Sequence, residues 1–337
     1  MGLLRRTAAL LAAPLIAAGA LASSAQAAPA PARPAEPQAN AARGGTLLGL
    51  DIHTAGRVAL ISMRADGSGR RVLIPSQPIG GLAPAAEFSP DGRQVAYSVA
   101  GDIYVMPSGG GAARRIVGGT YASSSPSWSP DGRYIAYSSC VPQTAECDIF
   151  RVTVAKPAGS VVRLTDDSLD AATPCEAAAG FWSPAWSPRG DAIAVAIHCR
   201  SLDDETYWTW TGGLLAAKGG QLTKTFPSLA FGSPDWSPDG RWLAFRDASG
   251  DADLDEAAIY VVRPNGSGLR QLTPLRSNID KANNADRPVW SPDGRQVAYA
   301  RAGHPPSGEP TDLWVTNATG SSRHRVARDI LPLDWTR

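Results

Sequence analysis

The chain has 337 residues, of which 43% are hydrophobic, and its formal net charge is +1. A chain of this length can form a single large all-β domain. Because the charge is near neutral and no basic stripe runs along the sequence, we do not expect a nucleic acid or a membrane surface as a partner.

The N-terminal residues predict a leader and a linker. Arg5 and Arg6 precede an apolar stretch over residues 7–22, which is followed by an Ala-Gln-Ala ending typical of a secretory signal peptide over residues 1–27. A retained membrane anchor is the alternative. Residues 28–44 are rich in Pro and Ala, cannot bury a core and predict a disordered linker. We therefore expect a monomer that is secreted or located in the periplasm or cell envelope, with no membrane span after signal cleavage.

One motif recurs along the rest of the chain. It reads FSPDGRQVAYS from Phe88, and its copies open at Trp128, Trp186, Trp236 and Trp290, at spacings of 40 to 58 residues. In each copy Pro is preset for the first corner of a turn and Gly supplies a left-handed residue, so the motif predicts a strand, a tight turn and a second strand. Repeats of this period made of strands and turns are typical of β-propellers.

A third and a fourth strand are expected after each of these hairpins, which gives the four strands of one propeller blade. Leu333 to Trp335 repeats the start of the motif, and the strand expected at 46–51 lacks a partner before it, so the two ends of the chain should share one blade. The predicted fold is all-β, a six-bladed propeller of four-stranded antiparallel blades over residues 45–337. The blades are expected at 46–75 with 330–337, 84–118, 124–165, 182–223, 232–273 and 286–327, and the third strand of the fourth blade at 206–211.

The full repeat reads W-S-P-D-G-R-x-[IVL]-A-[YF], followed by DIYV at 102–105 or AIYV at 258–261 and closed by RQLT at 270–273. This pattern resembles the TolB-like (WD40-like, PD40) β-propeller repeat over about residues 45–337. Similar repeats occur in the non-catalytic propellers of prolyl oligopeptidase-like enzymes. The resemblance includes neither the small N-terminal domain of TolB nor a hydrolase domain, so it implies the fold and no particular reaction.

The expected topology sorts the connections between strands onto two faces. The SPDG turns and the turns between third and fourth strands form one face, here named the turn face. The loops between second and third strands and the connections between blades form the other, the loop face. The long insertions all fall on the loop face, where variable loops on a rigid scaffold usually carry binding. We therefore expect a protein or peptide partner, in the cell envelope or outside the cell, to bind there.

All four cysteines also map to the loop face. An even number of cysteines in a secreted chain indicates disulfides. We predict the pairs Cys140–Cys147 and Cys175–Cys199, with free or differently paired thiols as the alternative.

Three carboxylates directly precede the aromatic residue that opens a repeat: Glu87, Asp235 and Asp334. Because the innermost strands of a propeller line its central channel, these side chains are candidates for binding a cation or a basic group of a partner. Alternatively, each of them hydrogen-bonds locally between blades.

Four aromatic residues of the fourth blade, Trp182, Tyr207, Trp208 and Trp210, are candidates for a platform on which a sugar or a partner side chain stacks. Packing between blades is the alternative. Such a platform would favour a carbohydrate- or small-ligand-binding propeller.

The acidic stretch 247–256 alternates carboxylates, and Asp251, Asp253 and Asp255 are candidate ligands for Ca²⁺. A solvated acidic loop is the alternative. Ca²⁺ is therefore a cofactor that the sequence allows, and none is required.

An enzymatic function is the third hypothesis. His53, His198 and His304 are expected near second-strand ends on the loop face, where imidazoles can hold a metal for a lyase or hydrolase reaction. Scattered surface histidines are the alternative, and no G-x-S-x-G, P-loop or H-E-x-x-H motif is present. We therefore expect a non-enzymatic protein- or peptide-binding module, with a carbohydrate- or small-ligand-binding propeller and a metal-dependent lyase or hydrolase as alternatives.

Overall fold

All regular secondary structure in the described part of the chain consists of β-strands. The computed structural model describes residues 45–336 except for 55–56, 79–84, 120, 142–146, 166–176, 201–207, 227–228, 230, 248–256, 275–283 and 303–310. The predicted leader and linker at residues 1–44 therefore lie outside the described residues and stay predictions.

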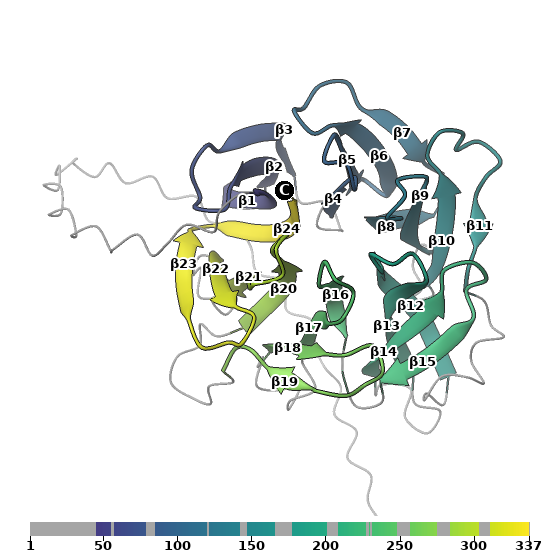
Figure 1. Cartoon of the computed structure of the whole chain (residues 1–337). Coiled ribbons are helices and arrows are strands. Elements are labelled where there is room, and N and C mark those ends of the chain that lie inside the picture. The colour runs from purple at the N-terminus through teal and green to yellow at the C-terminus, as the bar shows by residue number, and fades with distance from the viewer. Residues whose placement is uncertain are drawn as a thin grey trace, which may run out of the picture. The chain divides into compact units, whose positions relative to one another are not determined.

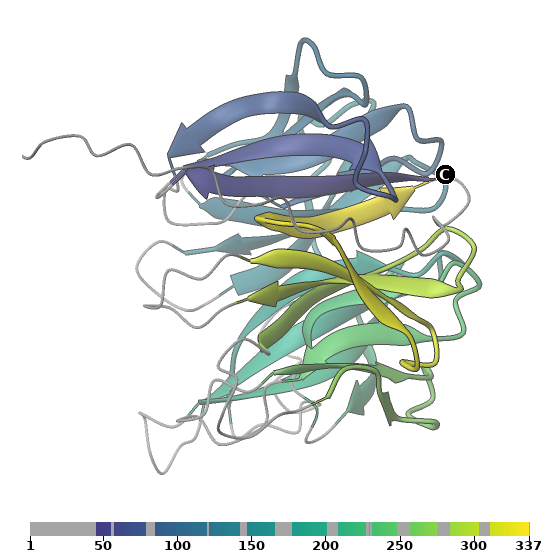
Figure 2. The same cartoon turned by 90° about the vertical axis from the view of Figure 1, so that its left-hand side faces the viewer.

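The strands form four sheets of four strands and one sheet of eight. Figure 1 shows the sheets arranged around a common centre, and Figure 2 shows neighbouring sheets stacked face to face. This arrangement confirms the predicted all-β propeller of small antiparallel sheets.

Three of the four-stranded sheets are meanders of consecutive strands. The first consists of β4 (Ala86–Phe88), β5 (Gln94–Val99), β6 (Asp102–Pro107) and β7 (Arg114–Val117). The second consists of β16 (Gly232–Trp236), β17 (Leu243–Asp247), β18 (Ala258–Val262) and β19 (Arg270–Gln271). The third consists of β20 (Asn284–Trp290), β21 (Gln296–Ala302), β22 (Asp312–Asn317) and β23 (Arg323–Ala327).

The fourth four-stranded sheet joins the two ends of the described chain. Its order is β24-β1-β2-β3, with β24 (Ile330–Thr336), β1 (Thr46–Thr54), β2 (Arg57–Arg64) and β3 (Arg71–Pro78). β24 pairs antiparallel with β1, and Leu47 lies opposite Trp335. The predicted closure of one blade by the N- and C-terminal strands is confirmed.

The eight-stranded sheet consists of two antiparallel meanders. One contains β8 (Ala122–Trp128), β9 (Tyr134–Cys140), β10 (Cys147–Thr153) and β11 (Val162–Arg163). The other contains β12 (Ala177–Trp186), β13 (Ala192–Arg200), β14 (Trp208–Ala216) and β15 (Leu222–Phe226). A single parallel pair, Cys147 opposite Gly180, joins the two meanders.

The predicted third strand at 206–211 was wrong in its bounds, because β14 runs from Trp208 to Ala216 and includes Gly212 and Gly213. A Cβ at Gly212 would overlap the ring of Phe231, and one at Gly213 would lie 2.8 Å from Cδ1 of Ile197. The backbones of both glycines continue the strand. Glycine is required at these positions because neighbouring side chains fill the space that a larger residue would need.

Hydrophobic clusters fill the space between neighbouring sheets. One of them joins Ile103 and Val105 of β6 to Trp128 of β8 and to Ile135 and Tyr137 of β9. Such clusters recur between the other neighbouring sheets. Four of the five motif aromatics are thus buried, Trp186 is half-buried, and the apolar runs after them pack between blades, as the repeat predicts.

The SPDG turns share one hydrogen-bond network. In four of them the Ser hydroxyl donates to the Asp carboxylate at 2.6 to 2.7 Å, and that carboxylate accepts the N–H of the following Arg at 3.0 to 3.1 Å. The Ser hydroxyl hydrogen bond is the main cause that lowers the pKa of Asp91 and Asp131. In the remaining turn, between β12 and β13, Arg189 stands in place of Asp, and its N–H donates to Oγ of Ser187 at 3.2 Å.

Substitution of Gly132 tests this interpretation of the turn. Its φ of +68° lies in the left-handed region, where a β-branched residue is strained. We expect Gly132→Val to lower the free energy of unfolding by roughly 1 to 3 kcal/mol, measured by chemical denaturation. Gly132→Asn is the matched control and should retain more stability, because Asn tolerates this conformation. Equal stability of the valine variant and the wild type would contradict the assignment.

Turn glycines also bring neighbouring four-stranded meanders into backbone contact. Gly220 has a φ of +69°, and a Cβ there would overlap the carbonyl oxygen of Leu164. A Cβ on Gly320 would lie 2.8 Å from the carbonyl oxygen of Leu272. At these points only a residue without a side chain allows the turn to lie against the outer edge of the preceding meander.

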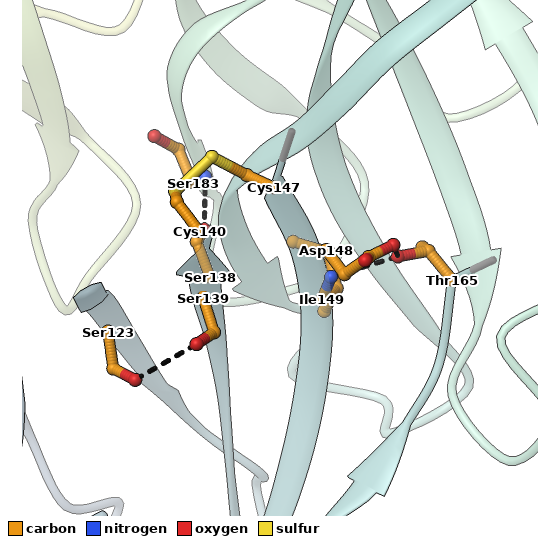
Figure 3. Close-up of a disulfide and its surroundings, with 9 residues drawn as sticks. All are labelled: Ser123, Ser138, Ser139, Cys140, Cys147, Asp148, Ile149, Thr165 and Ser183. Carbon is orange, nitrogen blue, oxygen red and sulfur yellow. Dashed lines mark hydrogen bonds between the residues drawn. A yellow bond between two sulfur atoms is a disulfide. The ribbon is translucent and has the colours of Figure 1, made fainter. Parts of the chain in front are cut away.

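The predicted disulfide between Cys140 and Cys147 is confirmed. It joins the end of β9 to the start of β10, and the two Cα atoms lie 4.0 Å apart (Figure 3). Close by, Oγ of Ser138 accepts the N–H of Ser183 from the next meander at 3.1 Å. Cys199 is also disulfide-bonded, and its predicted partner, Cys175, lies outside the described residues.

The described part of the chain contains no helix of the length and hydrophobicity that crossing a membrane requires.

Candidate functional site

The innermost strands of the sheets enclose a central cavity of about 130 Å³. Residues from β4, β8, β12, β16, β20 and β24 line it, so every four-stranded set contributes. These strands lie nearest the centre in Figure 1. Within each of them the chain runs from the loop face toward the turn face, so residues early in the strand lie nearer the loop face.

Four cavity-lining residues have an uncommon backbone conformation. Ser125, Ser183, Ser233 and Arg287 have φ values between 46° and 52°, and each directly precedes a proline. Residues before proline normally prefer extended conformations. In all four strands the register shifts at this point, as at a β-bulge. Bulges and strained residues are common beside binding sites, where they redirect a side chain.

Sequence reasoning missed these four residues. The signal was present as a Pro two positions before Trp128, Trp186, Trp236 and Trp290. The pattern x-Pro-x-Trp marks the bulge in each of these innermost strands.

The three predicted channel carboxylates all line the same cavity. Each also hydrogen-bonds to the next sheet. Oδ2 of Asp334 accepts the N–H of Phe88 at 2.6 Å, and Oδ2 of Asp235 accepts that of Trp290 at 2.6 Å. Oε2 of Glu87 accepts the N–H of Trp128 at 3.3 Å. The local hydrogen bonds between sheets are therefore present and the carboxylates converge on the channel, while binding of a cation or a basic group stays a prediction.

Burial raises the pKa of all three carboxyls. The pKa of Asp235 rises to about 7 and that of Asp334 to about 6, in both cases chiefly because protein surrounds the group. The pKa of Glu87 lies well above its ordinary value, first through burial and then through the charge of Asp334. Each side chain keeps a small surface toward the cavity, but the walls on all sides leave little water to solvate a charge.

Arg287 is the cation that lines this cavity. Its side chain is half-buried, and its backbone N–H donates to Oδ1 of Asp286 at 2.7 Å. That carboxylate lies 3.9 Å from Nε of Arg246. Among the described residues the guanidinium of Arg287 has no hydrogen bond or ion pair, so it remains available to a ligand at the loop-face side of the channel.

The aromatic residues of the fourth blade are partly brought together. His198 lies opposite Trp210, and Trp182 lies opposite Ala196, so the three side chains share one face of the sheet. The rings of His198 and Trp210 stack with centroids 4.4 Å apart, and burial lowers the pKa of His198. Trp210 is 42% exposed. The packing alternative, which predicts a buried core residue, is therefore wrong for Trp210.

Other predicted site residues lie wholly or partly outside the description. Tyr207, His304 and the three candidate calcium ligands Asp251, Asp253 and Asp255 lie outside the described residues. Trp208 and His53 belong to β14 and β1, and their side chains are not described. Within the described residues, no three His, Cys, Asp or Glu side chains are grouped so as to hold a metal ion.

Solved structures with similar folds include two TolB proteins. The crystal structure of TolB from Acinetobacter baumannii aligns with a TM-score of 0.64 and 18% identity, covering 87% of this chain and 66% of that one. A putative TolB from Agrobacterium tumefaciens aligns with a TM-score of 0.57 and 18% identity, covering 86% and 90%. The chain has the fold of the TolB-like β-propellers. The resemblance first seen in the repeats is therefore confirmed at the level of the fold.

Two further comparisons bear on whether the chain is an enzyme. No family model matches the chain. An oligogalacturonate lyase in complex with manganese aligns with a TM-score of 0.50 and 16% identity, covering 84% of this chain and 74% of that one. The fold is thus shared with at least one enzyme and leaves enzymatic activity open.

Curated relatives match only part of the chain. An uncharacterized peptidase of Bacillus subtilis, YuxL, is 29% identical over 114 residues, which are 34% of this chain and 16% of that protein. An uncharacterized protein of Agrobacterium fabrum is 32% identical over an alignment of 173 positions that covers 47% of this chain and 52% of that protein. The chain spans about half the length of the second relative and a smaller part of the first.

Proposed function

We propose that this chain is a non-enzymatic six-bladed propeller that binds a protein or peptide partner at the entrance of its central channel on the loop face. The six blades are the four four-stranded sheets and the two meanders of the eight-stranded sheet. Its place of action is outside the cytoplasm, in the envelope or beyond it. The disulfide between Cys140 and Cys147 supports this location, because disulfides persist in oxidising compartments.

The observation that carries the proposal is the ring of four strained residues at the loop-face side of the channel. Ser125, Ser183 and Ser233 present hydroxyls, and Arg287 presents a guanidinium without a partner among the described residues. A peptide that enters the channel offers backbone groups and carboxylates to these side chains. The TolB-like fold of the neighbours is consistent with a binding module of this kind.

Photo-crosslinking from inside the full-length chain tests the proposal. A benzoyl-phenylalanine in place of Ala85, which lines the cavity just before β4 and leaves Arg287 intact, should crosslink a specific protein from the envelope or culture fluid. The same group in place of Arg133, in an SPDG turn on the turn face, is the matched control and should not crosslink that protein. Crosslinking of one protein from the control position alone would contradict binding at the channel entrance.

A carbohydrate or another small ligand is the second candidate, favoured by the exposed Trp210 ring that His198 supports from one side. This function predicts that Trp210→Ala weakens binding of an oligosaccharide while Arg287→Glu does not. Calcium assistance through the acidic stretch is a part of this candidate that calorimetry with Ca²⁺ would test. The metal-dependent lyase or hydrolase stays a prediction of the sequence.

A further inference from the structure

A second cavity lies on the turn face, opposite the proposed partner site. Its volume is about 390 Å³, in the range of small-ligand sites. Three separate turns line it: the SPDG-type turns of the fourth and fifth blades and the turn between β18 and β19. The lining residues are Arg189, Gly240, Arg241, Trp242, Arg263, Pro264 and Asn265.

Positive charge gathers around this cavity. The guanidinium groups of Arg263 and Arg270 lie 4.9 and 5.5 Å from the ring centre of Trp242. Cation–π attraction of this kind holds cations beside a ring, and here it offsets the repulsion between two neighbouring guanidinium groups. Trp242 therefore supports both arginines. Arg263 lines the cavity, whereas Nη2 of Arg270, beside it, donates to the carbonyl oxygen of Ala318 at 2.8 Å.

Two more cations complete the cluster with Arg241. Arg189 extends from the fourth blade to the fifth, and its Nη2 donates to the carbonyl oxygen of Asp239 at 3.2 Å. Lys224 lies against the turn between β18 and β19, since a Cβ on Gly266 would be 3.7 Å from its Nζ. The cluster thus contains Arg189, Lys224, Arg241, Arg263 and Arg270.

Within the described residues, one ion pair involves these five cations, and Asp191 follows Arg189 in the same turn without pairing with it. Oδ2 of Asp239 lies 3.8 Å from Nε of Arg241, and both groups are exposed. The same carboxylate already accepts the hydroxyl of Ser237 at 2.6 Å and the N–H of Arg241 at 3.0 Å. The other four cations of the cluster form no ion pair with a described residue.

Arg189 occupies a turn position at which the other repeats have Asp. At this position the other four turns have Asp91, Asp131, Asp239 and Asp293, each bonded to its turn serine. The fourth blade thus has a cation in place of an anion at one of the three turns that line the cavity. The turn keeps its shape, because Gly190 retains a φ of +74° and its N–H still donates to the carbonyl of Ser187 at 2.8 Å.

We propose that this cavity is a binding site for a small phosphate-bearing ligand with at least two negative charges. Planar guanidinium groups match phosphate oxygens with paired hydrogen bonds. A multiply charged phosphate neutralises several cations within a cavity of this size, whereas a single carboxylate neutralises one. The site lies on the opposite face from the channel entrance and does not depend on the proposed partner.

The test uses inorganic pyrophosphate as the probe and isothermal calorimetry on the full chain at low salt. We expect a Kd below about 1 mM that rises as salt screens the charges. Arg189→Asp, which restores the consensus Asp at this turn position and should fold, is expected to weaken binding by at least about tenfold. Arg93→Asp makes the same change of charge in another turn of the same face, and this matched control should leave the Kd within about twofold.

Three outcomes would overturn the proposal. The first is no binding of pyrophosphate by the wild type. The second is equal weakening by Arg189→Asp and Arg93→Asp, which would indicate general surface attraction. The third is tighter binding of a hexaglutamate peptide than of pyrophosphate, which would assign the site to acidic peptides instead.

Discussion

Between pH 5 and pH 8 the free energy of unfolding of this chain is expected to fall, because the channel carboxylates are buried. The pKa of Asp235 is raised from 3.8 to about 7 and that of Asp334 from 3.8 to about 6. A group whose pKa is higher in the folded than in the unfolded state stabilises the fold while it is protonated in both. That contribution is complete below pH 4 and is lost as the pH rises through 6 and 7. Since one pKa unit is worth about 1.4 kcal/mol, the expected loss is on the order of a few kcal/mol.

The variant Asp235→Asn isolates this effect. An amide oxygen can still accept the N–H of Trp290, and the cost of a buried charge is removed. Chemical denaturation at pH 5 and pH 8 should show a smaller loss of stability for Asp235→Asn than for the wild type. His198, whose pKa is lowered, gives the opposite slope but contributes equally to both proteins. The same pH dependence in variant and wild type would contradict the burial of this charge.

Gly220→Ala is expected to be the most damaging single substitution at a turn. Its Cβ would overlap the carbonyl oxygen of Leu164 on the outer edge of the preceding blade, and its φ of +69° is unfavourable for alanine. The strained backbone and the steric overlap together should lower the free energy of unfolding by on the order of 4 kcal/mol. Thermal and chemical denaturation measure this loss.

The neighbouring Gly219 provides the matched control. A Cβ at Gly219 would have no atom within 4 Å. Gly219→Ala should therefore change the free energy of unfolding by less than about 0.5 kcal/mol. A similar loss in both variants would show that the turn is sensitive to any side chain, rather than to contact between the two blades.

The sequence predicted the fold well because its repeat reports both packing and turn geometry. The aromatic residue and the apolar run of each copy occupy buried strands, and the SPDG glycines have the positive φ that the motif requires. The partial copy at Leu333 to Trp335 indicated the shared blade correctly. The disulfide from Cys140 to Cys147 was predictable because it bridges the short connection between two paired strands.

The candidate sites were harder to predict because they depend on contacts between repeats. Pro126 and its equivalents are visible in the sequence, but the positive φ before each proline follows from a bulge that only strand register reveals. The cations around Trp242 come from two blades, so no stretch of sequence is basic. Trp210 looks like a core residue by its alternation with Trp208, and only its place at the loop-face end of β14 leaves it exposed.

The most direct measurement for the proposed function is the affinity of the partner recovered by crosslinking for two charge-reversal variants of the chain. Isothermal calorimetry should show that Arg287→Glu weakens binding by at least about tenfold, as expected for loss of a charge-assisted contact. Arg133→Glu, on the turn face, should bind as tightly as the wild type. An unchanged Kd for Arg287→Glu together with a weakened one for Arg133→Glu would contradict binding at the channel entrance.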